Sequence, residues 1–142
     1  MVVTEGSRVK IPCGLHLAQS GLYVVALRNE QPISVNAHDS RIAERAIKVT
    51  KANCKFGKAK VLEGRRKNYD KTFGSEYVDF TPVAVLQDIA MAEKAILKKL
   101  DVYRIRGRTG RKNEWLQGIE YTDVITIIKE TLLEIQVDHQ IL

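Results

Sequence analysis

The segment Cys54–Tyr69 (CKFGKAKVLEGRRKNY) constrains the fold of this chain more than any other stretch. Its apolar beginning predicts a short strand over residues 53–57 that ends in Gly57, where the chain can turn. The charged stretch that follows predicts a helix over about residues 61–71. Phe73-Gly74 supplies the stop signal for that helix. The segment therefore predicts a strand, a glycine turn and a helix in close succession.

The predicted helix places two functional groups beside the turn. Arg65 and Tyr69 are four residues apart, so their side chains would share one face of the helix. Lys58 lies within the turn itself, which we expect to run through Lys58-Ala59-Lys60. A guanidinium, an ammonium and a phenol next to a glycine turn are groups that suit a phosphodiester ligand.

The rest of the chain predicts a mixed α/β (α+β) fold in one domain over residues 1–142. Asp39-Ser40 is a helix N-cap signal, and Thr81-Pro82 combines a cap with proline at the first helical position. We expect a small, mainly antiparallel sheet of about three strands, flanked by helices. The remaining predicted elements are strands over residues 21–27, 32–37 and 77–80, helices over residues 41–49, 81–100 and 121–137, and a loop over residues 104–112.

Charge is unevenly distributed along the 142 residues, whose formal net charge is +6. Residues 41–74 hold eleven Lys or Arg against three acids, and residues 102–112 hold five Lys or Arg and no acid. Residues 118–142 hold five acids and one Lys. This distribution indicates a polyanion bound on one face. An ordinary solvated basic surface explains the charge equally well.

Cysteine and histidine usage argues against a clustered metal site and against a disulfide-stabilised fold. Cys13 and Cys54 are too far apart for a clustered metal site and provide no disulfide framework, so we expect reduced thiols. His16, His38 and His139 have no metal-ligand spacing. No apolar run approaches membrane-spanning length, which predicts a soluble, cytoplasmic protein without membrane contact.

Glu93 falls inside the apolar stripe of the helix predicted over residues 81–100. An ionised carboxylate that faces a core costs several kcal/mol unless it is compensated. Three compensations remain open: a salt bridge with Arg65 or a lysine, a rim position that reaches water, or a bound divalent metal. The stripe consists of Leu86, Ile89, Ala90, Ile96, Leu97 and Leu100.

Over about residues 20–116 the chain resembles the GIY-YIG nuclease family. Gly21-Leu22-Tyr23 is similar to the family's first motif, and Lys55-Phe56-Gly57 to its second. The run GKAKVLEGRRKNY resembles the stretch that follows the second motif. Asn113 is similar to the family's C-terminal asparagine, and Glu114-Trp115-Leu116 resembles the ending of phage-type branches.

The resemblance implies a role for each matched residue. Glu93 would hold one Mg²⁺ or Mn²⁺, and Tyr23 would be the general base, with a pKa lowered by nearby cations. Arg65 would bind the scissile phosphate in a fork geometry that lysine cannot reproduce. Lys58 would add positive charge, and Tyr69 would orient water or phosphate.

The chain departs from the family pattern in two places. Lys55 occupies the position of the second motif's tyrosine, which removes a phenol that could orient water. About thirty residues separate Tyr23 from Gly57, which is longer than the family's usual spacing. The excess, residues 32–51, predicts an inserted helix on the tip of a hairpin, and such an insertion costs little closure entropy.

These features lead to three hypotheses. The first is a metal-dependent DNA endonuclease of GIY-YIG type, from a prokaryotic or phage-infected host cell. The second is a nucleic-acid-binding module with weakened catalysis on the same fold. The third is an interaction protein that forms a homodimer through the amphipathic helix over residues 121–137. The residues expected to contact duplex or branched DNA are Lys55, Lys60, Arg66, Lys67, Arg104, Arg106, Arg108, Arg111 and Lys112.

Overall fold

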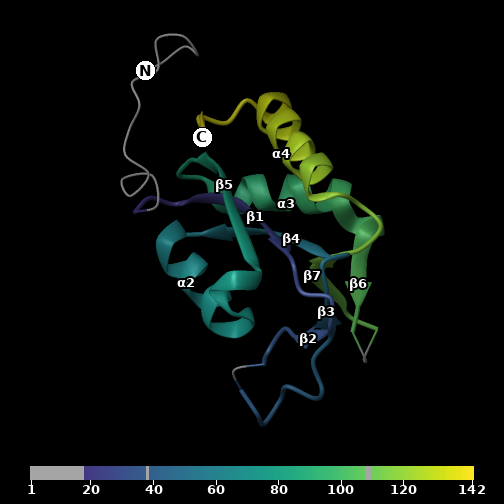
Figure 1. Ribbon diagram of the computed structural model, residues 1–142. Helices are drawn as coiled ribbons and strands as arrows, with labels where there is room; N and C mark the ends of the chain where they lie inside the picture. The colour runs from purple at the N-terminus through teal and green to yellow at the C-terminus, as the bar shows by residue number, and fades with distance from the viewer. Residues whose placement is uncertain (1–17, 38, 108–109) are drawn as a thin grey trace.

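The computed structural model describes residues 18–37, 39–107 and 110–142, and within them the fold is α+β (Figure 1). A six-stranded antiparallel sheet has the order β6-β7-β4-β1-β5-β8, and β2 and β3 form a separate pair. The sheet is larger than the three strands that we predicted. The elements are β1 (Gly21–Leu27), β2 (Ile33–Ser34), β3 (Lys48–Val49), β4 (Cys54–Ala59), α2 (Leu62–Phe73), β5 (Val78–Val85), α3 (Ile89–Leu100), β6 (Arg104–Arg106), β7 (Lys112–Leu116), α4 (Tyr121–Ile135) and β8 (Gln140–Ile141).

Strand β1 lies at the centre of the sheet, between β4 and β5. Its sequence, GLYVVAL, is rich in β-branched and apolar residues, which suits a strand covered on both faces. Helix α2 covers one face of the sheet, and α3 and α4 cover the other (Figure 1). We call these the α2 face and the α3 face.

Alternation along the strands divides the core into two clusters. On the α3 face, Leu22, Val24 and Phe56 pack against apolar residues of α3 and α4. On the α2 face, Tyr23 and Val25 pack against the helix. This second cluster includes Tyr23, Ala59, Leu62, Tyr69, Phe73 and Trp115.

The helix predicted to begin at Thr81-Pro82 is wrong in its first part, because both residues lie inside β5. Pairing with β1 overrides the local cap signal, and a bulge between Leu22 and Tyr23 accommodates the proline. Pro82 has no backbone N–H to donate. Strand β8 pairs with β5 only from Ala84 onward, so no hydrogen bond between these two strands requires a donor at Pro82. Asp88 caps α3 instead, with its Oδ1 accepting from the backbone N–H of Met91 at 3.3 Å.

The inserted helix predicted over residues 41–49 is also wrong. The backbone N–H of Ala43 donates to the carbonyl of Asp39 at 2.9 Å, but this pattern continues only to Ala46 and forms turns rather than a helix. Val49 is fully buried and pairs with Ile33 as part of β3. The burial of Val49 in strand β3 therefore outweighs the local helical periodicity of residues 41–49.

The stretch 104–112, predicted to be a loop, contains β6 and the first residue of β7, which pair as the strands of a hairpin. Strands β6 and β7 pair through Arg104 opposite Leu116 and Arg106 opposite Lys112. Trp115 and Leu116 are buried and anchor β7 beside β4, which gives the charged hairpin a fixed base. Arg108 lies outside the described residues.

Helix α4 confirms the predicted C-terminal helix, although it ends at Ile135 rather than residue 137. Its apolar stripe, Val124, Ile128 and Leu132, is fully buried in the chain's own core. The homodimer that we expected through this helix would therefore need the opposite side of α4. Among the described helices, none has the length and apolarity that crossing a bilayer requires.

Candidate active site

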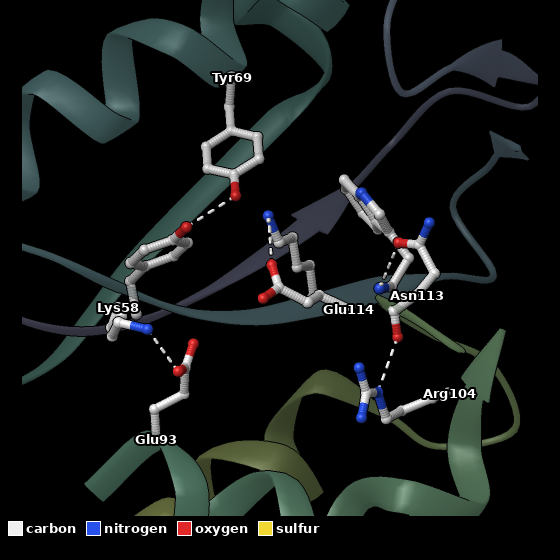
Figure 2. Close-up of polar contacts among 9 residues, drawn as sticks. Lys58, Tyr69, Glu93, Arg104, Asn113 and Glu114 are labelled. Carbon is white, nitrogen blue, oxygen red and sulfur yellow. Dashed lines mark hydrogen bonds and ion pairs between the residues drawn. The ribbon is translucent and has the colours of Figure 1, made fainter. Parts of the chain in front are cut away.

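Two tyrosines from distant parts of the sequence meet on the α2 face. Tyr23 extends from the middle of β1 and Tyr69 from α2, and their hydroxyl oxygens are 2.7 Å apart in a hydrogen bond (Figure 2). Gly57 pairs opposite Tyr23 in the neighbouring strand. A Cβ added to Gly57 would lie 2.5 Å from the Cζ of Tyr23 and closer still to its hydroxyl. Glycine at this position is what leaves room for the tyrosine ring.

This finding changes the role that we predicted for Gly57. The strand does not end at Gly57, and β4 continues through Lys58 to Ala59. The glycine serves close packing against Tyr23 rather than a turn. Helix α2 then begins at Leu62, near the predicted position, and Gly74 ends it with a φ of 93°.

Burial controls the electrostatics of the tyrosine pair. Loss of solvent raises the pKa of the Tyr23 phenol, the neighbouring Tyr69 raises it further, and the charges of Lys55 and Arg65 offset only part of this effect. Burial likewise raises the pKa of Tyr69 to about 12. The lowered pKa expected for a general base at Tyr23 is therefore not produced by the charges of this chain. Both phenols keep their protons at neutral pH.

A cavity of about 260 Å³ opens beside Tyr69 on the α2 face. Lys55 and Arg65 both line it and bring two positive charges to its wall. The Lys55 ammonium lies 5.1 Å from the centroid of the Tyr69 ring and 3.4 Å from Glu114 Oε1. Lysine at the position of the second motif's tyrosine thus presents a cation, rather than a phenol, to this cavity.

Sequence reasoning missed several polar residues of this cavity. Asn68 and Thr72 lie three and seven residues after Arg65 and share its helix face, so helical spacing could have identified them. Asn36 comes from the insertion, and no local pattern indicates that it reaches α2. Asn113, which was predicted, lines the cavity, and its Oδ1 accepts from the backbone N–H of Trp115 at 3.1 Å.

Lys58 and Glu93 lie on the opposite side of the sheet from the tyrosine pair. Gly57 faces Tyr23, so the next residue, Lys58, points to the α3 face. There it forms an ion pair with Glu93 of α3 (Figure 2). The Glu93 side chain is 16% exposed, so the compensation expected for this carboxylate is met by a lysine. Neither residue lines the cavity beside Tyr69.

The donor set around Glu93 decides how well a metal ion would fit. Within the described parts of the chain, no three His, Cys, Asp or Glu side chains gather into a metal-binding group. A single carboxylate suits Mg²⁺ only when waters and phosphate oxygens supply the other ligands. Glu93 can offer its Oε2 to such an ion while Lys58 occupies Oε1. Glu93 can therefore supply one oxygen to a hydrated Mg²⁺ or Mn²⁺ on the α3 face, across the sheet from the cavity that Arg65 and Tyr69 line.

The remaining basic residues fall into two groups. On α2, Arg66 pairs with Glu63 and Asp70 of its own helix, and none of the three lines the cavity. Lys60 and Lys67, near the start of the helix and along it, are not among the residues that line the cavity.

On the β6–β7 hairpin, Asp101 binds both Arg104 and Lys112. The Nε of Arg104 also donates to the backbone carbonyl of Asn113 at 2.9 Å (Figure 2). Arg106 donates to the carbonyl of Gly110 at 2.9 Å. Arg104, Arg106 and Lys112 are therefore held in place by contacts with Asp101, Gly110 and Asn113.

A scan against protein-family models, a search of curated proteins and a search of solved structures each found no match to this chain.

Proposed function

We propose that this protein is a metal-dependent endonuclease that hydrolyses DNA phosphodiester bonds by a GIY-YIG-type mechanism. The observation that carries the proposal is the convergence of three separate segments around Gly57. Tyr23 of β1 and Tyr69 of α2 share a hydrogen bond there, and Arg65 stands one helical turn before Tyr69 at the same cavity. Lys55 adds a second cation. Gly57 leaves room for the Tyr23 ring, which places the hydrogen-bonded tyrosine pair next to the two cations of the cavity.

Each residue of this group has a chemical task at a phosphodiester. Arg65 is exposed and can bind two phosphate oxygens through its planar guanidinium. When Tyr23 donates its proton to the Tyr69 oxygen, the Tyr69 hydroxyl is free to donate to a phosphate oxygen or a water in the cavity. Because both phenols hold their protons, they act as donors rather than as bases in the free protein.

Glu93 would hold the metal ion in this mechanism. A bound Mg²⁺ would supply positive charge to the phosphate and to the leaving oxygen. Lys58 orients the Glu93 carboxylate through their ion pair. Lys58 would also compete with the metal for one carboxylate oxygen.

The placement of Glu93 favours a second candidate function, a nucleic-acid-binding module with weakened catalysis. The carboxylate is already neutralised by Lys58 and lies across the sheet from the tyrosine pair. Lys55 replaces the second tyrosine. A protein with these features would bind a phosphate at Arg65 and Lys55 without cleaving the strand.

Nicking of supercoiled plasmid separates the two functions. The purified chain is incubated with plasmid in Mg²⁺ and in EDTA, and DNA binding is measured in parallel by gel shift. The endonuclease proposal expects open-circular product in Mg²⁺ alone, and it expects Arg65→Ala to lower the rate by at least about 100-fold, the scale of one lost transition-state contact. Binding without product at any metal concentration would reject the enzyme and leave the binding module.

A further inference from the structure

A second basic hollow lies beside the candidate active site. It has a volume of about 510 Å³ and lies between the insertion, residues 32–51, and the β6–β7 hairpin. Arg45 comes from the insertion, and Arg104, Arg111 and Lys112 come from the hairpin. The insertion thus stands opposite the hairpin as a wall.

The two hollows adjoin each other. Val35, Asn36 and Asn113 line both the cavity beside Tyr69 and the hollow beneath the hairpin. Together they form one groove that runs from α2, past Asn113, to the tip of the insertion. We call this the insertion groove.

Hydrogen bonds fix the insertion in this position. The backbone N–H of Val35 donates to the carbonyl of Ile47 at 3.0 Å. The buried Ser34 hydroxyl donates to the carbonyl of Ala43 at 2.7 Å and accepts from the N–H of Asn36 at 3.1 Å. Arg45 therefore projects from a turn that is tied to β2 on both sides, rather than from a free loop.

The charge of the insertion groove is strongly positive. Of the residues that the structure describes, Glu114 is the one acidic residue that lines either hollow, and it is paired with Lys55. Asp101 offsets Arg104 and Lys112. Among the described residues, Arg45 and Arg111 have no acidic partner. The six cations of the groove are Arg45, Lys55, Arg65, Arg104, Arg111 and Lys112.

We propose that the insertion groove holds the phosphate backbone of a nucleic-acid strand on one side of the site of cleavage, with the insertion as its second wall. The proposal rests on the proposed function for the identity of the polyanion. Arg45 and Arg111 lie on the two facing walls and have no acidic partner among the described residues, so phosphates that displace their counterions would lower the free energy. The insertion, which interrupts the resemblance to the nuclease family, is on this view a binding element.

The test measures nucleic-acid affinity against salt concentration in EDTA, so that cleavage plays no part. Fluorescence anisotropy with a labelled 20-base-pair duplex and with the matching single strand gives the slope of log affinity against log salt. The variants are Arg45→Gln and Arg111→Gln. Arg41→Gln is the matched control within the insertion, because Arg41 is highly exposed, is paired with Asp39 and does not line the groove. Lys129→Gln on α4 controls for net charge.

Each groove variant should reduce the steepness of the slope by about 0.9 on duplex or about 0.7 on single-stranded nucleic acid. On duplex, this means that the affinity lost between 50 and 200 mM salt becomes about 3.5-fold smaller for each arginine removed. The slope change measured on the duplex and the one measured on the single strand are compared to identify which form of nucleic acid the groove binds. Both controls should keep the wild-type slope.

Slopes for Arg45→Gln and Arg111→Gln that equal those of the controls would overturn the groove, even if plasmid cleavage is observed. Normal slope changes without any cleavage would support the groove and reject the endonuclease. Failure of the wild-type protein to bind either probe would reject both proposals.

Discussion

Replacement of Gly57 by alanine tests the packing on which the candidate active site depends. Tyr23 is fully buried, and the new Cβ would lie 2.5 Å from its Cζ. The ring cannot move outward because α2 covers it, so the clash must be relieved by shifting the ring or the strand. Overpacking of this kind costs about 1–3 kcal/mol, and loss of the buried Tyr23–Tyr69 hydrogen bond adds about 1 kcal/mol. We expect a loss of about 2–4 kcal/mol in the free energy of unfolding.

The chain provides a matched control at Gly64 of α2. A Cβ added there would have no neighbour within 4 Å, and alanine favours a helix over glycine by about 0.5–1 kcal/mol. Gly64→Ala should therefore leave the protein unchanged or slightly more stable. A third variant, Tyr23→Phe, removes the hydroxyl that lies nearest to the new methyl group. In that background Gly57→Ala should cost about 1 kcal/mol less, because the hydrogen bond is already absent.

Urea denaturation followed by circular dichroism at 25 °C gives the free energies of wild type and of these variants. A Gly57→Ala variant within about 0.5 kcal/mol of wild type would refute the reasoning, since it would mean that Tyr23 is not packed against β4. Equal costs of Gly57→Ala in the wild-type and Tyr23→Phe backgrounds would show that the hydroxyl takes no part in the contact.

Three further predictions concern charge. Glu93→Gln should abolish plasmid nicking while lowering stability by no more than about 1 kcal/mol, because the Lys58 left behind is 39% exposed; a large fall in melting temperature with retained nicking would contradict the metal-binding role. The pKa of Tyr69 is about 12 in the folded protein against an ordinary value of 10.0, so the folded state binds more protons between these pH values, and its stability is present below pH 10 and is lost as pH rises through 12. The part of the decline that Tyr69 contributes should reach at most about 1.4 kcal/mol per pH unit and should be absent in Tyr69→Phe, as measured by urea unfolding from pH 9 to 12. Arg66→Ala should weaken DNA binding a few-fold without changing the cleavage rate, because Arg66 pairs with acids of its own helix; a rate loss equal to that of Arg65→Ala would mean that the helix acts only as a basic surface.

Local sequence patterns predicted the parts of the fold that local forces decide. The apolar run of β1, the strand before Gly57, helix α2 with its glycine stop and the stripe of α4 all formed where expected. Thr81-Pro82 was misread because a cap signal is local, whereas pairing with β1 is not. Likewise, the charges of residues 104–112 concealed a hairpin whose stability comes from Trp115 and Leu116, outside that stretch.

The candidate site was predicted only where local spacing decides it. Arg65 and Tyr69 were expected to share a helix face from their spacing, and both line the cavity. Lys58 was assigned to a turn beside them. Because β4 continues past Gly57, alternation sends Lys58 to the other face, where it meets Glu93. A glycine is compatible both with a turn and with close packing inside a strand. The sequence around Gly57 therefore could not decide whether Lys58 lies in a turn or in a strand.

The sharpest test of the proposed endonuclease is the variant Arg65→Lys, with its dissociation constant and its single-turnover cleavage rate measured on one duplex in Mg²⁺. Lysine keeps the positive charge at the cavity but loses the planar fork that can hold two phosphate oxygens. We predict a dissociation constant within about threefold of wild type and a cleavage rate at least about tenfold lower. An unchanged rate, or a loss of affinity that accounts for the whole effect, would show that Arg65 is only one more cation on a nucleic-acid-binding surface.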